Sequence, residues 1–162
     1  MIRMKNELVL KQFIIARRRL LKALEDVTEE MAAKKPEGFN NNIHWHAGHI
    51  LSAAEQFLFR LPGGSVNIPD NYKDFFANGT KPDDWKETPP SFQQIVAQLK
   101  EQEARVKDGK DSIEERLDET LVPPFTLRSG LRMDTVGELI NMAIYHEGVH
   151  TGYISAMKRI IG

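Results

Sequence analysis

The stretch TVGELINMAIYHEGVHTGYISAMKRI, residues 135–160, indicates most clearly how this chain folds. Thr135 and Glu138 have the spacing of a capping box, in which two side chains satisfy backbone N–H groups at the start of a helix. On a helical projection, one face then collects Leu139, Met142, Ala143, Tyr153 and Met157. The pattern predicts a long amphipathic helix that starts near Thr135 and runs close to the C-terminus.

Two histidines, His146 and His150, lie on the apolar face of this predicted helix. Their spacing places them roughly 40° apart, whereas Glu147 falls toward the edge of the face. Two buried imidazoles are unfavourable unless their nitrogens find polar partners. A metal ion satisfies both at once, although carbonyls, hydroxyls or water would also serve. We therefore predict that both histidines point into the protein, and we favour a metal site.

Residues 146–150 also match H-E-x-x-H, the motif of zinc proteases. In those enzymes a third metal ligand normally comes from later in the chain, but no His, Asp or Glu follows His150. A third ligand must come from upstream, and Glu147 is not well placed to activate water. The motif alone therefore does not indicate a peptidase.

Three further long helices are predicted upstream. Residues 5–27 carry apolar side chains at spacings of three and four. A second helix is predicted over residues 42–61, with Asn41 or Asn42 as its N-cap. A third begins at Ser91, which has the capping-box spacing to Gln94.

The connections between these helices are long. Residues 62–90 are rich in Pro, Gly, Asn and Asp, and they form either a loop that covers the core or a lid over a pocket. A short helix over residues 112–117 and a small hairpin within residues 121–135 are also predicted. We expect an all-α chain, a four-helix bundle with long connections, forming one domain over residues 1–162.

The other three histidines lie together in IHWHAGH, residues 43–49. On the projection of this helix, His49 lies roughly 120° from the centre of the apolar face, and His46 lies closer to that centre. The projection leans slightly toward His46 as the inward-facing residue, or leaves both as partly exposed surface residues.

The composition excludes several classes of function. The 162 residues include 22 Lys and Arg against 23 Asp and Glu, and a net charge of -1 does not favour nucleic acid. The basic run at residues 17–19 is interpreted as the solvated face of a helix. The absence of cysteine excludes disulfides, thiolate metal sites and a cysteine nucleophile. Without a secretion signal or a membrane-spanning apolar run, we expect a soluble cytoplasmic protein with no membrane partner.

Two motifs resemble those of the DinB-like family, which is also described with the YfiT-like metal-dependent proteins. The first is Trp45 followed four residues later by His49, and the second is the His146–His150 pair in the last helix. The order of helices and the long connection before the third are similar too. The resemblance implies a homodimeric four-helix bundle in which His49, His146 and His150 hold one divalent ion, nickel or zinc. His44 and His46 would then be neighbours of the site.

The resemblance also implies an enzyme that acts on a small molecule. The first hypothesis is a transferase that uses a low-molecular-weight thiol as cosubstrate, with the metal activating the thiolate. The alternatives are a metal-dependent hydrolase of a small amide or ester, and a non-catalytic dimeric metal-binding or stress-response protein. Trp45 and Tyr153 are candidate substrate contacts, with core packing as the alternative for each. The sequence identifies no catalytic residue.

Overall fold

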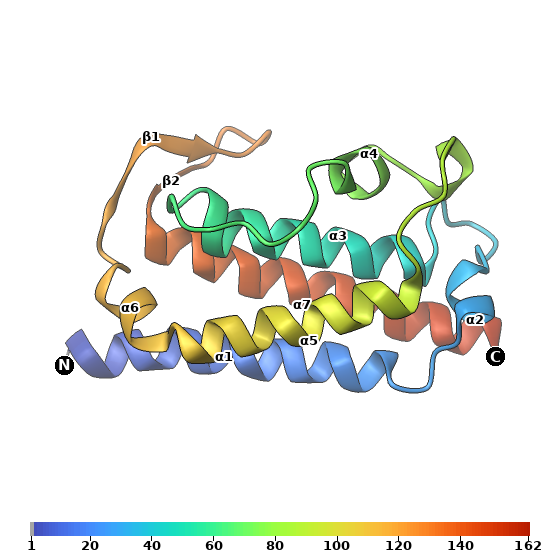
Figure 1. Ribbon diagram of the computed structural model, residues 1–162, viewed down its shortest axis with the longest axis horizontal. Helices are drawn as coiled ribbons and strands as arrows, with labels where there is room; N and C mark the ends of the chain where they lie inside the picture. Colours follow the sequence, from blue (N-terminus) through green and yellow to red (C-terminus); the bar gives the residue numbers. More distant parts are fainter. Residues whose placement is uncertain (1) are drawn as a thin grey trace.

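Four long helices form the bundle that the sequence predicts (Figure 1). This computed structural model describes the backbone of residues 2–162 and the side chains of residues 6–162. The long helices are α1 (Ile2–Leu24), α3 (Ile43–Glu55), α5 (Phe92–Asp108) and α7 (Val136–Ile161). Both α1 and α3 pack against α5 and α7, so the four surround a shared core. The predicted all-α bundle with long connections is confirmed.

The predicted helix starts are confirmed by their caps. At α7, the Thr135 hydroxyl accepts from the backbone N–H of Glu138, and the Glu138 carboxylate accepts from the backbone N–H of Thr135. The side chain of Asn42 caps α3, and that of Ser91 caps α5. After α3 the chain continues as a π-helix, η1 (Gln56–Arg60), so helical structure extends nearly to the predicted end.

Short elements occupy the connections. They are α2 (Glu29–Ala33), α4 (Tyr72–Phe76), the 3₁₀-helix η2 (Pro82–Asp84), α6 (Lys110–Glu115), β1 (Thr120–Thr126) and β2 (Arg132–Thr135). The two strands are antiparallel, with Phe125 opposite Met133, as the predicted hairpin requires. The sequence analysis did not predict α2. None of the helices within residues 2–162 has the length and hydropathy that crossing a membrane requires.

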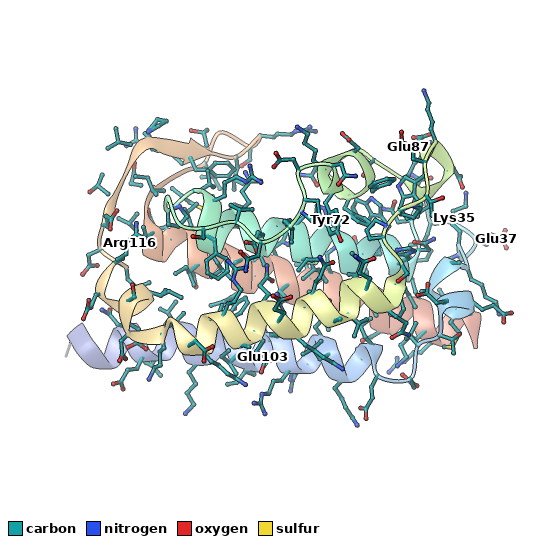
Figure 2. The ribbon with its side chains drawn as sticks, viewed as in Figure 1. Lys35, Glu37, Tyr72, Glu87, Glu103 and Arg116 are labelled. Carbon is teal, nitrogen blue, oxygen red and sulfur yellow. The ribbon has the colours of Figure 1, made fainter. Side chains whose placement is uncertain are left out.

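Residues 62–90 pack against the bundle through α4. Tyr72, Phe75 and Phe76 are buried, and α4 contacts α3. The Tyr72 hydroxyl at the start of α4 donates to Oε1 of Gln98 on α5 at 2.8 Å (Figure 2). The segment therefore covers the core, as one of the two alternatives states. Its movement as a lid stays a prediction.

Arg17 differs from its prediction. The side chain is 0% exposed, whereas Arg18 and Arg19 are exposed as expected. Arg17 lies on the same buried face of α1 as Phe13 and Leu20. The interpretation of residues 17–19 as a solvated face is therefore wrong for Arg17, because a buried carboxylate on α7 neutralises its charge.

Candidate metal centre

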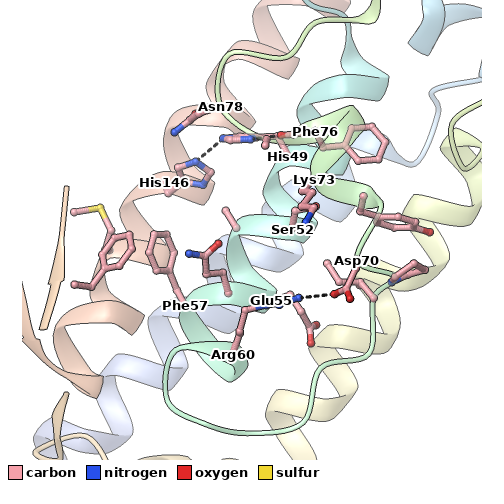
Figure 3. Close-up of a pocket in the computed structure, with 18 of the residues that line it drawn as sticks. His49, Ser52, Glu55, Phe57, Arg60, Asp70, Lys73, Phe76, Asn78 and His146 are labelled. Carbon is pink, nitrogen blue, oxygen red and sulfur yellow. Dashed lines mark hydrogen bonds and ion pairs between the residues drawn. The ribbon is translucent and has the colours of Figure 1, made fainter. Parts of the chain in front are cut away.

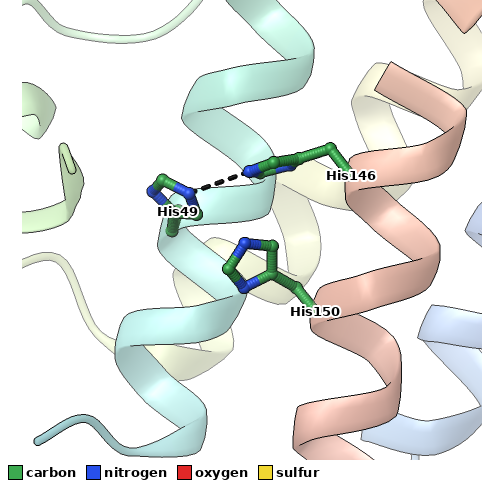
Figure 4. A group of neighbouring side chains, drawn as sticks. All are labelled: His49, His146 and His150. Carbon is green, nitrogen blue, oxygen red and sulfur yellow. Dashed lines mark hydrogen bonds between the residues drawn. The ribbon is translucent and has the colours of Figure 1, made fainter. Parts of the chain in front are cut away.

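Three histidines from two helices converge at one place in the bundle (Figure 4). His49 comes from α3, and His146 and His150 come from successive turns of α7. One ring nitrogen of each lies within 4.8 Å of the others, and the Nε2 atoms of His49 and His146 are 2.9 Å apart. The structure thus brings together the three residues that the family resemblance selects.

Two contacts hold the His49 ring. Its Nδ1 donates to the carbonyl oxygen of Phe76 at 2.7 Å, and the Trp45 ring stacks on it with centroids 4.6 Å apart. A carbonyl oxygen can only accept, so Nδ1 carries the proton of the neutral ring. Nε2 therefore presents a lone pair toward His146. A metal-bound histidine typically has this arrangement, with its second nitrogen donating to a carbonyl or carboxylate.

Gly48 allows Phe76 to approach α3 closely. A Cβ atom at Gly48 would lie 2.4 Å from the Phe76 ring, so the ring and its backbone would have to move. A few residues further on, Thr80 accepts from Nε1 of Trp45 at 2.9 Å. The segment 62–90 therefore supplies the acceptors that hold both Trp45 and His49.

A fourth histidine, His46, lies against the cluster. Its Nδ1 is 2.9 Å from Nδ1 of His150. His46 is 4% exposed and His49 is 5% exposed, so the alternative that leaves both on the surface is wrong. His44 points elsewhere, because its Nε2 donates to the carbonyl oxygen of Pro90 at 2.8 Å.

Glu147 lies between the two α7 histidines in sequence but faces the core of the bundle. Its carboxylate accepts from Nε of Arg17 at 3.0 Å and from Nη2 at 2.8 Å. Arg17 also donates to the Leu99 carbonyl and to Gln102. Glu147 is 1% exposed, so its predicted place at the edge of the apolar face is wrong. Because Arg17 occupies both carboxylate oxygens, Glu147 is not available as a water-activating base.

Burial keeps the histidines of the cluster neutral. Desolvation first, and then the neighbouring His49 and His46, lower the pKa of His146 from 6.5 to about 4. Desolvation and the other three rings lower the pKa of His150 to about 2. Burial also lowers the pKa of His49, although its bond to the Phe76 carbonyl opposes this. Neutral imidazole is the protonation state that a metal ligand needs.

A cavity of about 400 Å³ opens beside His49 and His146 (Figure 3). The volume falls in the range of small-molecule sites, roughly 300–1,000 Å³. The π-helix η1 forms part of the wall, and π-helical turns often occur at functional sites. The remaining walls come from α3, from residues 68–78, from β1 and the residue after it, and from α7. The candidate metal position therefore borders a space large enough for a small ligand.

Neither Trp45 nor Tyr153 lines this cavity. Trp45 is buried against His49, as its core-packing alternative states. Tyr153 is 47% exposed, so core packing is wrong for this residue, and its ring stacks on His46 at 5.3 Å. Substrate contact stays a prediction for both.

The sequence analysis missed Gly48 and Phe76, which support the cluster, and Arg17, which pairs with Glu147 between the two α7 histidines. A signal for Arg17 does exist, because Phe13, Arg17 and Leu20 are spaced by four and three residues along one helix face. No comparable signal marks Phe76, whose carbonyl reaches His49 only because residues 62–90 fold back onto α3.

Comparisons with known proteins agree with this architecture. The sequence profile described as the DinB superfamily matches residues 12–154. The structure is similar to a crystal structure described as the conserved protein of locus from Enterococcus faecalis, with a TM-score of 0.63 and 20% identity over 96% of this chain and 95% of that chain. That likeness shows the fold alone, and no curated protein matches. Because the profile spans most of the chain, including His49, His146 and His150, this protein belongs to the DinB superfamily.

Proposed function

We propose that His49, His146 and His150 bind one divalent metal ion and that the protein is a metal-dependent enzyme for a small molecule held in the adjoining cavity. One observation carries this proposal. Three uncharged imidazoles from two helices converge where the cavity meets the bundle, and two of them line it.

The residues fit an ion of this kind. The Nε2 atoms of His49 and His146 are 2.9 Å apart. Adjacent ligands that each lie about 2.0–2.1 Å from one ion are roughly 3 Å apart, so this pair already has the required spacing. The set of three lies within 4.8 Å, so binding would draw the rings closer together. The bond to Phe76 already aims the lone pair of His49 into the cluster. Imidazole ligands suit nickel and zinc.

Three protein ligands leave coordination positions open for a substrate. A metal ion in this position would lower the pKa of a bound thiol, so a small thiol could react as its thiolate at neutral pH. This chemistry needs no carboxylate base. Two carboxylates near the site are already engaged in ion pairs. Glu147 pairs with Arg17, and Glu55, which lines the cavity, pairs with Arg105 at 2.8 Å. A thiol transferase is therefore favoured over a hydrolase.

The cavity suggests what its electrophilic substrate looks like. Phe57, Phe125 and Met142 provide apolar walls. Lys73 also lines the cavity and has no ion-pair partner among residues 6–162, whereas Arg60 pairs with Asp70 at 3.4 Å. An apolar body with one acidic group would match this lining. In the transfer, a carbon–sulfur bond would form, the leaving group would depart, and the thiol proton would pass to solvent.

Metal content is the first test. Protein purified without an affinity tag should contain about one divalent ion per chain, and His150→Ala should contain none. His44→Ala is the matched control, because His44 is a buried histidine on α3 that bonds to Pro90 instead of the cluster. Wild-type protein that stays metal-free after incubation with nickel and zinc would contradict the proposal.

Activity is the second test. The metal-loaded protein should consume an acidic aryl halide only when a small thiol is present, and His150→Ala should not. Metal-dependent cleavage of an ester or amide without thiol would identify a hydrolase instead. If the metal-loaded protein consumes neither the aryl halide nor an ester or amide, a non-catalytic metal-binding protein would be favoured.

A homodimer is also part of the proposal, and the surface of α7 supports it. Tyr145 and Ile160 are 68% and 57% exposed, and the partly exposed Val149 and Tyr153 lie between them. At 100° per residue these four side chains fall on one side of the helix, and contiguous apolar surface of this kind is typical of protein–protein interfaces. Light scattering should give a dimer for the wild type and a monomer for Tyr145→Lys, whereas an unchanged mass would move the interface elsewhere.

A further inference from the structure

The cluster contains one more histidine than the proposed metal site uses. His46 is buried and lies on α3, one turn before His49. Its Nδ1 is 2.9 Å from Nδ1 of His150, a hydrogen-bond distance. Two neutral imidazole nitrogens at this distance must share one proton, so one nitrogen donates and the other accepts.

The direction of this bond follows from the His150 ring. Its Nδ1 faces His46, and Figure 4 shows its other nitrogen toward His49 and His146. If Nε2 gives its lone pair to an ion, the proton of the neutral ring is on Nδ1. His150 then donates and His46 accepts.

We propose that His46 is a positioning residue for the metal centre, which accepts a hydrogen bond from Nδ1–H of His150 and so holds that ring in the tautomer and orientation that binds metal. This inference rests on the proposed metal site. It also separates His46 from the ligands, because its Nδ1 is occupied by His150.

The neighbours of His46 are arranged to keep its ring fixed. Tyr153 stacks on one side with centroids 5.3 Å apart and planes 14° apart. Trp45 meets the ring edge-on, with centroids 5.2 Å apart and planes 86° apart. The half-exposed Tyr153 thereby acquires a role: it shields the acceptor of His150. Trp45 serves both sides of the cluster, since it also stacks on His49.

α4 and α3 thus each provide a hydrogen-bond acceptor for one of the proposed ligands. His49 donates to a backbone carbonyl, and His150 donates to a side-chain acceptor. Outer acceptors of this kind typically change metal affinity by about 10–100-fold when they are removed. A carbonyl cannot be removed by substitution, whereas His46 can be, so His46 offers the direct test.

The experiment measures Co²⁺ binding to the full-length chain by competition with a chelator, for the wild type, His46→Leu, His46→Asn and His150→Ala. We expect His46→Leu to weaken binding about 10–100-fold while the stoichiometry at saturation stays at one. His46→Asn should bind more tightly than His46→Leu, because an amide oxygen can replace the lost acceptor. His150→Ala should lose the cobalt absorption bands. The matched control His44→Leu should keep the wild-type affinity.

Each contrary result has its own meaning. If His46→Leu binds Co²⁺ as tightly as the wild type, His46 has no positioning role and only this inference fails. If His46→Leu loses the absorption bands at saturation, as His150→Ala does, His46 is a ligand. If the wild type binds no Co²⁺, the proposed function fails together with this inference. The ¹⁵N shifts of metal-free wild type add an independent readout, and an unprotonated Nδ1 of His150 would overturn the proposed direction.

Discussion

Glu147 and its neighbours in α7, His146 and His150, have very different surroundings. Glu147 meets a side chain of opposite charge, and Arg17 bonds to both of its oxygens. The two histidines meet other imidazoles, at 2.9 Å in each case. A buried group with a complementary partner is fully satisfied by the protein. A neutral imidazole whose only partner is another imidazole can exchange that hydrogen bond for a bond to a cation, and this difference separates a structural contact from a candidate site.

The largest expected effect on stability comes from the Glu147–Arg17 ion pair. Glu147→Ala leaves the buried Arg17 without a counter-charge, which should lower the free energy of unfolding by about 3–5 kcal/mol. Urea unfolding of metal-free protein measures it. The double variant Arg17→Met with Glu147→Leu should recover most of the loss, because it removes both charges. A loss below about 1 kcal/mol in Glu147→Ala would mean that water already solvates Arg17.

The histidine cluster should instead change the free energy of unfolding when metal binds. Free Zn²⁺ at about 100 times its dissociation constant should stabilise the wild type by about 2.7 kcal/mol, because only the folded chain assembles the site. His150→Ala should show no such gain in the same urea titration, while its metal-free stability stays near that of the wild type. Equal stabilisation of both proteins would place the metal elsewhere.

Acid should destabilise the metal-free protein through the same histidines. The folded-state pKa values of His146 and His150, about 4 and about 2, lie below the ordinary value of 6.5. The unfolded chain therefore binds more protons as the pH falls below about 6.5, and stability is lost from there toward pH 4. Each histidine contributes at most about 1.4 kcal/mol per pH unit. Unfolding at pH 7, 6 and 5 should give a shallower decline for His150→Leu, and an identical decline would contradict the assignment.

The last expected effect concerns the approach of Phe76 to α3. Gly48→Ala should cost about 1–3 kcal/mol, because the new methyl group overlaps the Phe76 ring. It should also weaken metal binding, since the carbonyl that orients His49 moves with that ring. Gly148→Ala is the control, because nothing lies within 4 Å of its added methyl group. That variant should be neutral or slightly stabilising, and equal effects of both variants on metal affinity would contradict this role of Gly48.

The sequence by itself determined the features that depend on neighbours along the chain. The caps at Asn42, Ser91 and Thr135 satisfy backbone N–H groups within three residues, so their spacing predicts where the long helices begin. The spacing of His146 and His150 likewise places both on one side of a helix. The all-α bundle follows from these local signals.

Only the tertiary structure decided how the histidines of α3 meet the pair on α7, with His49 against His146 and His46 against His150. α3 is enclosed by α4, α5 and α7, and residues 42–51 are all buried, so a projection that seeks one apolar face cannot separate His46 from His49. The burial of Arg17 was decided in the same way, because its counter-charge lies 130 residues away in the chain. The carbonyl that orients His49 also comes from a different segment. These contacts join residues that no local spacing relates, so the sequence pattern could place Arg17 on an apolar face of its helix but could not identify the partner of any of these groups.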